Sequence, residues 1–166
     1  MYSKKKSGFT LIEVLIVLLF ISLFAGMGLA RFNDYSDTQK MENNVSKLID
    51  VFELAKKNSA TAFFPTNPSS CEGIFQGYSV YITNSGYSMR ILCDTTTTFQ
   101  NYLFDTPILL GADHYEVIFP ALNGQAVVYP VDKMILSGQR LEYCIKVDPS
   151  GLIRDAKMTA SVCPLS

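Results

Sequence analysis

Residues 4–30 constrain this chain more than any other part of it. Three lysines at positions 4–6 precede Gly8, and an apolar run extends from Phe9 to Ala30. As a helix, this run extends about 33 Å, and the hydrocarbon core of a bilayer is about 30 Å thick. The run therefore predicts a transmembrane segment. The lysines are expected on the cytoplasmic side, with the C-terminal part of the chain exported.

One carboxylate, Glu13, interrupts the apolar run. An acidic side chain at the centre of a membrane helix costs roughly 2.5 to 3.5 kcal/mol, and less near a helix end. A simple anchor or secretion signal would gain stability from Leu at this position. We therefore expect the charge of Glu13 to have a partner, either inside the membrane or inside an assembly.

Three interpretations of this segment compete. A secretory signal peptide would be cut after Ala30 and would release a secreted domain. A permanent membrane anchor would keep the whole segment, but neither of these two uses Glu13. Cleavage between Gly8 and Phe9 would remove the lysines and create a new ammonium group on Phe9, which can balance Glu13 of a neighbouring subunit. Only the third interpretation uses the lysines, Gly8 and Glu13 together.

The run Lys-Ser-Gly-Phe-Thr-Leu-Ile-Glu, which ends at Glu13, resembles the prepilin leader of type IV pilins and type II secretion pseudopilins. This resemblance implies cleavage after Gly8 by a prepilin peptidase, N-methylation of Phe9, and a role for Glu13 in docking into a filament. Major type IV pilins often have a proline near position 30, and residues 25–31 contain none. The missing proline favours a minor pilin or a pseudopilin.

The same resemblance implies a structural subunit that needs no cofactor and is not an enzyme. Its partners would be the prepilin peptidase, other pilin or pseudopilin subunits and an assembly platform of the bacterial inner membrane. The subunit would lie in that membrane before assembly and in a periplasmic or extracellular filament afterwards.

Apolar residues recur at helical spacing after Asp37, which predicts that the helix continues to about residue 60 and packs on a sheet. Pro65 and Pro68 would prevent its extension. The expected segments are a leader (1–8), a transmembrane or filament-core half-helix (9–30), an amphipathic half-helix (31–62) and a β-rich part (63–166). The residues of the amphipathic stripe are Met41, Val45, Leu48, Ile49, Phe52 and Ala55.

Alternating apolar and polar residues separated by turn signals predict six or seven short strands after Cys71. The expected fold class is α+β, in which the long helix packs on one antiparallel sheet or on two small ones. The predicted strand pairs are 78–83 with 87–93, 115–119 with 125–129, and 133–136 with 141–147, followed by a strand at 152–154.

A second, looser resemblance rests on short runs at 117–120 (Val-Ile-Phe-Pro), 123–124 (Asn-Gly), 135–136 (Ile-Leu), 145–147 (Ile-Lys-Val) and 151–153 (Gly-Leu-Ile). With these runs, residues 115–154 resemble the C-terminal half of the minor pseudopilin H and FimT-like group, whereas residues 62–110 resemble no family. Some FimT-like proteins bind DNA, so a DNA-binding minor pilin is an alternative function. DNA binding requires clustered Lys and Arg. Basic side chains in residues 111–166 are instead dispersed among carboxylates, which makes nucleic acid an unlikely partner.

The four cysteines, at positions 71, 93, 144 and 163, form no Cys-x-x-Cys pair, so their spacing disfavours a zinc site. An even number in an exported chain predicts two disulfides, for which three pairings exist. We favour the sequential pairing, Cys71–Cys93 and Cys144–Cys163, because each pair encloses a short local segment.

No catalytic group is recognisable in the sequence. The single histidine, His114, is expected at the surface or in a turn, and no nucleophile motif or phosphate-binding glycine loop is present. The threonine-rich segment 94–105 is expected to be a connection whose aromatic side chains pack on the sheet edge, or else an exposed loop that contacts a neighbouring subunit.

Overall fold

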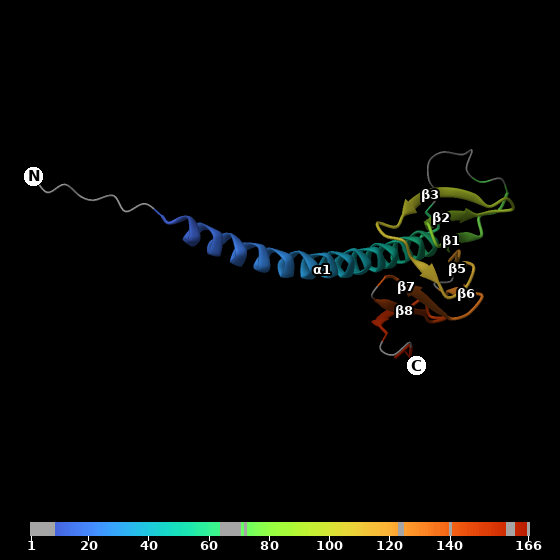
Figure 1. Cartoon of the computed structure of the whole chain (residues 1–166). Helices are drawn as coiled ribbons and strands as arrows, with labels where there is room; N and C mark the ends of the chain where they lie inside the picture. The colour runs from blue at the N-terminus through green and yellow to red at the C-terminus, as the bar shows by residue number, and fades with distance from the viewer. Residues whose placement is uncertain are drawn as a thin grey trace, which may run out of the picture. The chain divides into compact units, whose positions relative to one another are not determined.

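The computed structural model describes residues 9–63, 71, 73–122, 125–139, 141–158 and 162–165; for residues 25, 27–31 and 34 it describes the backbone alone. In this part of the chain a long helix is followed by antiparallel strands, so the predicted α+β class is confirmed (Figure 1). The elements in chain order are α1 (Leu11–Ala60), β1 (Gly77–Thr83), β2 (Gly86–Leu92), β3 (Thr97–Leu103), β4 (Leu109–Leu110), β5 (Tyr115–Pro120), β6 (Val127–Tyr129), β7 (Lys133–Ser137), β8 (Glu142–Val147) and β9 (Ile153–Lys157).

Helix α1 ends in a hydrogen-bonded cap. The N–H of Phe63 donates to the carbonyl of Asn58 (2.9 Å), and the N–H of Ala62 donates to the carbonyl of Ser59 (3.1 Å). Ala62 has a φ of 48°, so the chain turns in the left-handed conformation that completes a Schellman motif. The helix therefore stops where the sequence predicts it to stop.

The chain divides into two compact units, Met1–Ser36 and Asp37–Ser166. Helix α1 contributes residues to both units. The four segments expected from the sequence, with boundaries after residues 8, 30 and 62, stay predictions.

The strands of the second unit form two antiparallel sheets. Sheet A has the strand order β3-β2-β1-β5-β6, and sheet B has the order β4-β7-β8-β9. The predicted pairings are found as β1 with β2, β5 with β6, and β7 with β8. Residues 123 and 124, between β5 and β6, lie outside the described residues.

Two strands were not predicted. Residues 97–103, expected to be a connection or a loop, form the edge strand β3 of sheet A. Leu109–Leu110 form the short edge strand β4 of sheet B. Most of β3 is exposed, so the alternation of buried and exposed residues that reveals a half-buried strand is missing from its sequence.

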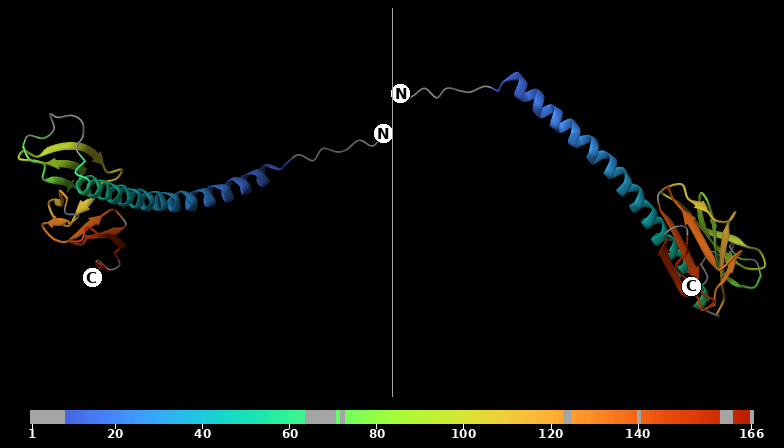
Figure 2. Two further views of the ribbon diagram at one scale, coloured as in Figure 1. Left: turned by 180° about the vertical axis from the view of Figure 1, so that it is seen from behind. Right: turned by 60° about the horizontal axis from the view of Figure 1, so that its bottom comes forward.

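The predicted stripe of α1 is the centre of the hydrophobic core. Five of its six residues are buried, and Ile49 is partly buried against the same cluster. That cluster also contains the inward-facing side chains of β1, β2, β5, β7 and β8, so α1 and both sheets share one core. Figures 1 and 2 show the C-terminal part of α1 running along the two sheets.

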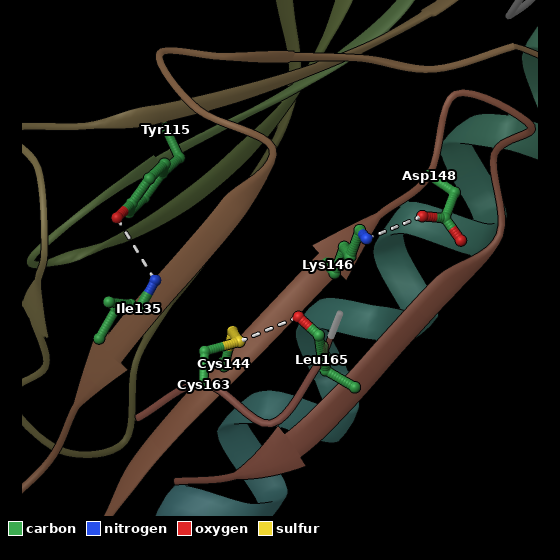
Figure 3. Close-up of a disulfide and its surroundings, with 7 residues drawn as sticks. All are labelled: Tyr115, Ile135, Cys144, Lys146, Asp148, Cys163 and Leu165. Atoms are coloured by element: carbon green, nitrogen blue, oxygen red, sulfur yellow. Dashed lines mark hydrogen bonds and ion pairs between the residues drawn. A yellow bond between two sulfur atoms is a disulfide. The ribbon is translucent and has the colours of Figure 1, made fainter. Parts of the chain in front are cut away.

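Hydrogen bonds tie the helix to sheet A and sheet A to sheet B. The buried Ser59 hydroxyl contacts the carbonyls of Phe119 (2.5 Å) and Pro120 (2.8 Å), which joins the end of α1 to β5. The backbone N–H of Ile135 in β7 donates to the hydroxyl of Tyr115 in β5 (3.3 Å), as Figure 3 shows. These bonds hold the two sheets in one arrangement around the helix.

The structure contains the two disulfides of the sequential pairing. Cys71 is bonded to Cys93 and Cys144 to Cys163, with Cα–Cα distances of 5.6 Å in both cases. The second disulfide joins the C-terminal tail to β8 (Figure 3). A disulfide that closes a loop of about 20 residues stabilises a fold by about 3 kcal/mol.

A buried asparagine holds the segment that follows β3. Asn44 on α1 is 1% exposed. Its side-chain oxygen accepts from the N–H of Asp105 (3.0 Å), and its Nδ2 lies 3.2 Å from Oγ1 of Thr106. The ion pair Lys47–Asp105 (2.8 Å) lies at the surface beside these bonds.

We predict that Asn44→Ala lowers the free energy of unfolding by about 1–3 kcal/mol, because it leaves the N–H of Asp105 without its acceptor. The exposed neighbour Asn43 supplies the control, since Asn43→Ala should change stability by less than about 0.5 kcal/mol. Urea unfolding followed by circular dichroism measures both values, and equal effects of the two substitutions would contradict this role of Asn44.

Tyr87 lies in the core where sheet A meets its edge strand. Its ring stacks on Tyr102 (centroids 5.0 Å apart) and lies 5.2 Å from the ring of Phe104. Burial and, to a smaller extent, the charges of Tyr102, Asp105 and Asp50 together raise the pKa of Tyr87 to about 12.

Because Tyr87 ionises near pH 10 in the unfolded chain and near pH 12 in the folded one, the unfolded chain binds fewer protons between these values. Its contribution to the free energy of unfolding is complete below pH 10. We predict a loss of about 3 kcal/mol as the pH rises to about 12. Urea unfolding at pH 9 and pH 11 measures how much the free energy of unfolding falls between these values. It should fall less for Tyr87→Phe than for the unaltered protein. Equal falls in the two proteins would refute the role of Tyr87 in this pH dependence.

Candidate assembly site at the start of the long helix

The first turn of α1 is organised by Thr10 and Glu13. The N–H groups of Glu13 and Val14 donate to the carbonyl of Thr10 at 3.1 and 3.3 Å. The backbone N–H of Thr10 lies 3.5 Å from Oε2 of Glu13. Glu13 thus reaches back to the residue before the helix, as the acidic member of a capping box does.

This contact gives Glu13 a role that the sequence analysis did not consider. A negative charge in the first turn is also favourable because it faces the positive end of the helix dipole. The Thr-x-x-Glu spacing from Thr10 to Glu13 was the available signal. At 3.5 Å the hydrogen bond is long, so the exposed carboxylate keeps most of its capacity for another partner.

The surface around Glu13 is apolar. Phe9, Val14, Val17 and Leu18 lie with Glu13 around a hollow of about 330 Å³ on the helix surface. Their spacing by four, five, eight and nine residues from Phe9 places all five on one helix face. A neighbouring side chain that entered this hollow would meet an apolar lining, to which Glu13 contributes no polar surface.

The other large apolar side chains that the structure describes in this unit are exposed as well. Between Phe9, which is 83% exposed, and Phe24, none is less than 48% exposed. Of the polar residues in this stretch, Ser22 donates to the carbonyl of Leu19 (2.8 Å), so its hydroxyl is satisfied within the helix. Glu13 is the only ionisable side chain between Phe9 and Phe24.

A helix that is apolar on all sides is usually covered by protein or by lipid. Within the described residues, however, no helix combines the length and the apolar character that a membrane span requires. The predicted transmembrane character of residues 9–30 is therefore not confirmed by the structure. Of the predicted cleavage site, Phe9 lies just before α1, and Gly8 lies outside the described residues.

Residues 3–29 match the prokaryotic N-terminal methylation motif. The chain therefore has a prepilin-type leader like those of type IV pilins and pseudopilins. The matched residues include Gly8, Phe9 and Glu13. The curated proteins and the solved structures give no match to this chain. The resemblance of residues 115–154 to the pseudopilin H and FimT-like group stays a prediction.

The single histidine and the four cysteines belong to the second unit. His114 is half-buried just before β5, where its ring lies 5.1 Å from that of Tyr81. In the described part of the chain, no three His, Cys, Asp or Glu side chains are grouped so that they could hold a metal ion. The four cysteines are all in disulfides.

Several basic side chains of the second unit are paired with carboxylates. Arg154 lies 2.5 Å and Lys146 lies 3.7 Å from the carboxylate of Asp148. Lys157 pairs with Glu42 of α1. This pairing partly neutralises the positive charge that a nucleic acid would need.

Proposed function

We propose that this chain is a structural subunit of a type IV pilus-like filament or of a type II secretion pseudopilus, as a minor pilin or a pseudopilin. The observation that carries the proposal is the methylation motif at residues 3–29. The position of Phe9 supports it, because this residue lies two positions before the start of α1 at Leu11. Cleavage after Gly8 would leave a mature chain that begins with its helix.

The precursor would lie in the bacterial inner membrane, with the lysines of its leader on the cytoplasmic side and the second unit exported. A prepilin peptidase would cut between Gly8 and Phe9, and Phe9 would then be N-methylated. The two disulfides support an exported location, since disulfides persist in oxidising compartments.

The function would be assembly rather than catalysis. The exposed apolar side chains from Phe9 to Phe24 would exchange contacts with lipid for contacts with the helices of neighbouring subunits, at the inner-membrane assembly platform. This exchange changes hydrophobic burial little, so it does not by itself select one axial position. Glu13 can select the axial position, because an unpaired carboxylate among apolar side chains is costly. The amine of Phe9 on a neighbouring subunit would pair with this carboxylate only when the two subunits are displaced along the filament axis by one particular distance.

The structure also bears on the alternatives. Helix α1 continues without a break through Ala30, so a signal peptidase that cut there would have to cleave inside a helix. This continuity favours the filament subunit over a secreted domain. DNA binding by a minor pilin is disfavoured by the carboxylate partners of Lys146, Arg154 and Lys157.

Mass spectrometry of the mature chain tests the cleavage site. We expect an N-terminus at methylated Phe9, and we expect Gly8→Leu to leave the whole precursor because a bulky residue blocks the peptidase. Ser7→Ala is the control and should be processed normally. A mature chain beginning at Arg31, or an intact leader in the unaltered protein, would refute the proposal.

Substitutions of Glu13 separate its two roles. If its charge sets the register, Glu13→Ala, Glu13→Val and Glu13→Gln should all fold and be exported but enter filaments poorly, roughly tenfold less than the unaltered chain for a loss of about 1.4 kcal/mol. The amide of Glu13→Gln can still accept from Thr10. Normal filament entry by this variant, with failure of Glu13→Ala, would instead assign Glu13 to capping the helix.

Immunoblots of sheared filaments and of membranes measure the incorporated and exported fractions. Ser22→Ala is the matched control, because it removes another polar group of the same apolar stretch without removing a charge. Normal incorporation of all three Glu13 variants would show that Glu13 does not set the axial register of the subunit.

A further inference from the structure

The face of sheet A that points away from α1 carries an ordered row of polar and aromatic side chains. In β1, Tyr78, Val80 and Ile82 are buried in the core, so strand alternation places Ser79, Tyr81 and Thr83 on the opposite face. In the strand register, one residue of each of the other four strands lies level with Tyr81, so that the five residues form a line across the sheet. The outer row, as we name it, is Asn101, Ser88, Tyr81, Glu116 and Tyr129, from β3, β2, β1, β5 and β6.

Aromatic rings and one guanidinium group lie along this row. Cζ of Arg90 is 3.8 Å from the centroid of the Tyr81 ring, a cation–π contact. The centroid of the His114 ring lies 5.1 Å from that of Tyr81 and 6.1 Å from that of Tyr129. Tyr129 is 59% exposed, so the row ends in an accessible ring.

An open groove lies at the opposite end of the row. It has a volume of about 410 Å³, within the range of small-ligand sites, and its lining includes Tyr81, Thr83, Ser88, Arg90, Asn101 and Tyr102. Tyrosine, serine and asparagine also dominate antibody binding loops, where rigid rings supply contact area and small polar groups supply adaptable hydrogen bonds.

A buried hydroxyl adds a second observation. Ser79 follows the same alternation as Tyr81 and lies directly opposite Arg90 in the register. Its side chain is fully buried, and within the described residues its Oγ has no hydrogen-bond partner. Buried hydroxyl groups are nearly always paired in proteins, so Ser79 leaves one unsatisfied polar position beneath this face, opposite Arg90.

The charge of the sheet limits what can bind. Residues 77–129 contain one basic side chain, Arg90, and no lysine, whereas they contain four carboxylates at positions 94, 105, 113 and 116. Glu116 lies in the middle of the outer row. A nucleic acid or another polyanion would therefore be repelled.

We propose that the outer row binds a neutral glycan chain. Sugar rings present C–H faces, which fit aromatic ring faces, and hydroxyl groups, which need both donors and acceptors. Tyr129 and His114 supply the rings, because Arg90 covers a face of Tyr81, while Asn101, Arg90 and Glu116 supply donors and acceptors. Five strands about 4.8 Å apart give the row a length of roughly 19 Å, which suits an oligosaccharide rather than a single sugar.

Calorimetric titration of the full chain tests this proposal, in a zwitterionic detergent because sugar-based detergents would compete. The probes are hexasaccharides of β-1,4-linked glucose, β-1,4-linked N-acetylglucosamine and α-1,4-linked glucose, with oligothymidylate as the polyanion. We expect at least one hexasaccharide to bind and oligothymidylate not to bind. Tyr129→Ala should weaken binding by about tenfold or more, whereas Tyr129→Phe should retain most of it.

Tyr35→Ala is the matched control, because Tyr35 is a similarly exposed tyrosine (63%) on α1, outside sheet A. The proposal fails if no hexasaccharide binds, if only oligothymidylate binds, or if Tyr35→Ala and Tyr129→Ala have equal effects. It also fails if Tyr129→Ala only dissociates an oligomer, since the face would then contact a second copy. The row lies entirely in Asp37–Ser166, so these outcomes are independent of leader cleavage.

Discussion

The burial of one face of α1 beneath two sheets is the contact on which the second unit depends. Leu48, Phe52 and Ala55 are completely buried, and each large apolar side chain withdrawn from water stabilises the fold by about 1.5–3 kcal/mol. The inward faces of sheets A and B belong to the same cluster as this helix face. A helix that lost the stripe would leave both sheets with apolar surfaces exposed to water. The hydrogen bonds of Ser59 and Asn44 then fix which strands the helix meets, since both side chains are buried and bond to positions about 60 residues away.

The same helix has two kinds of surface along its length. After Asp37 its apolar face is covered by the strands of its own chain, whereas from Phe9 to Phe24 its apolar side chains are uncovered in the isolated chain. The first arrangement gives a stable domain, and the second gives a surface that needs partners. Glu13 is the one charged group in the uncovered stretch, and the long hydrogen bond from Thr10 satisfies it only in part. A partner that supplied a positive charge would therefore gain more at this position than elsewhere along the segment.

How much of the structure the sequence could reveal depended on how local each signal was. The hairpin of β1 and β2 was predictable because Asn84, Ser85 and Gly86 form a turn between two alternating strands that are neighbours in sequence. The disulfide pairing was predictable for a similar reason, since each bond closes a short segment. Strand β3 was missed because its residues are mostly exposed on both faces, which leaves no alternation to recognise. The capping contact of Glu13 was overlooked although its spacing was visible, because the apolar run suggested a membrane setting for the same carboxylate.

The sequence by itself determined the leader motif, the helix and its apolar stripe, and the α+β class. These features follow from periodicities of two and 3.6 residues, and from short motifs, all of which are properties of neighbouring residues in the chain. Only the tertiary structure decided that the strands divide into two sheets around one core, and that Asn101, Ser88, Tyr81, Glu116 and Tyr129 form one row. These side chains come from five strands, and strand register, fixed by packing of the buried faces, sets which of them are neighbours.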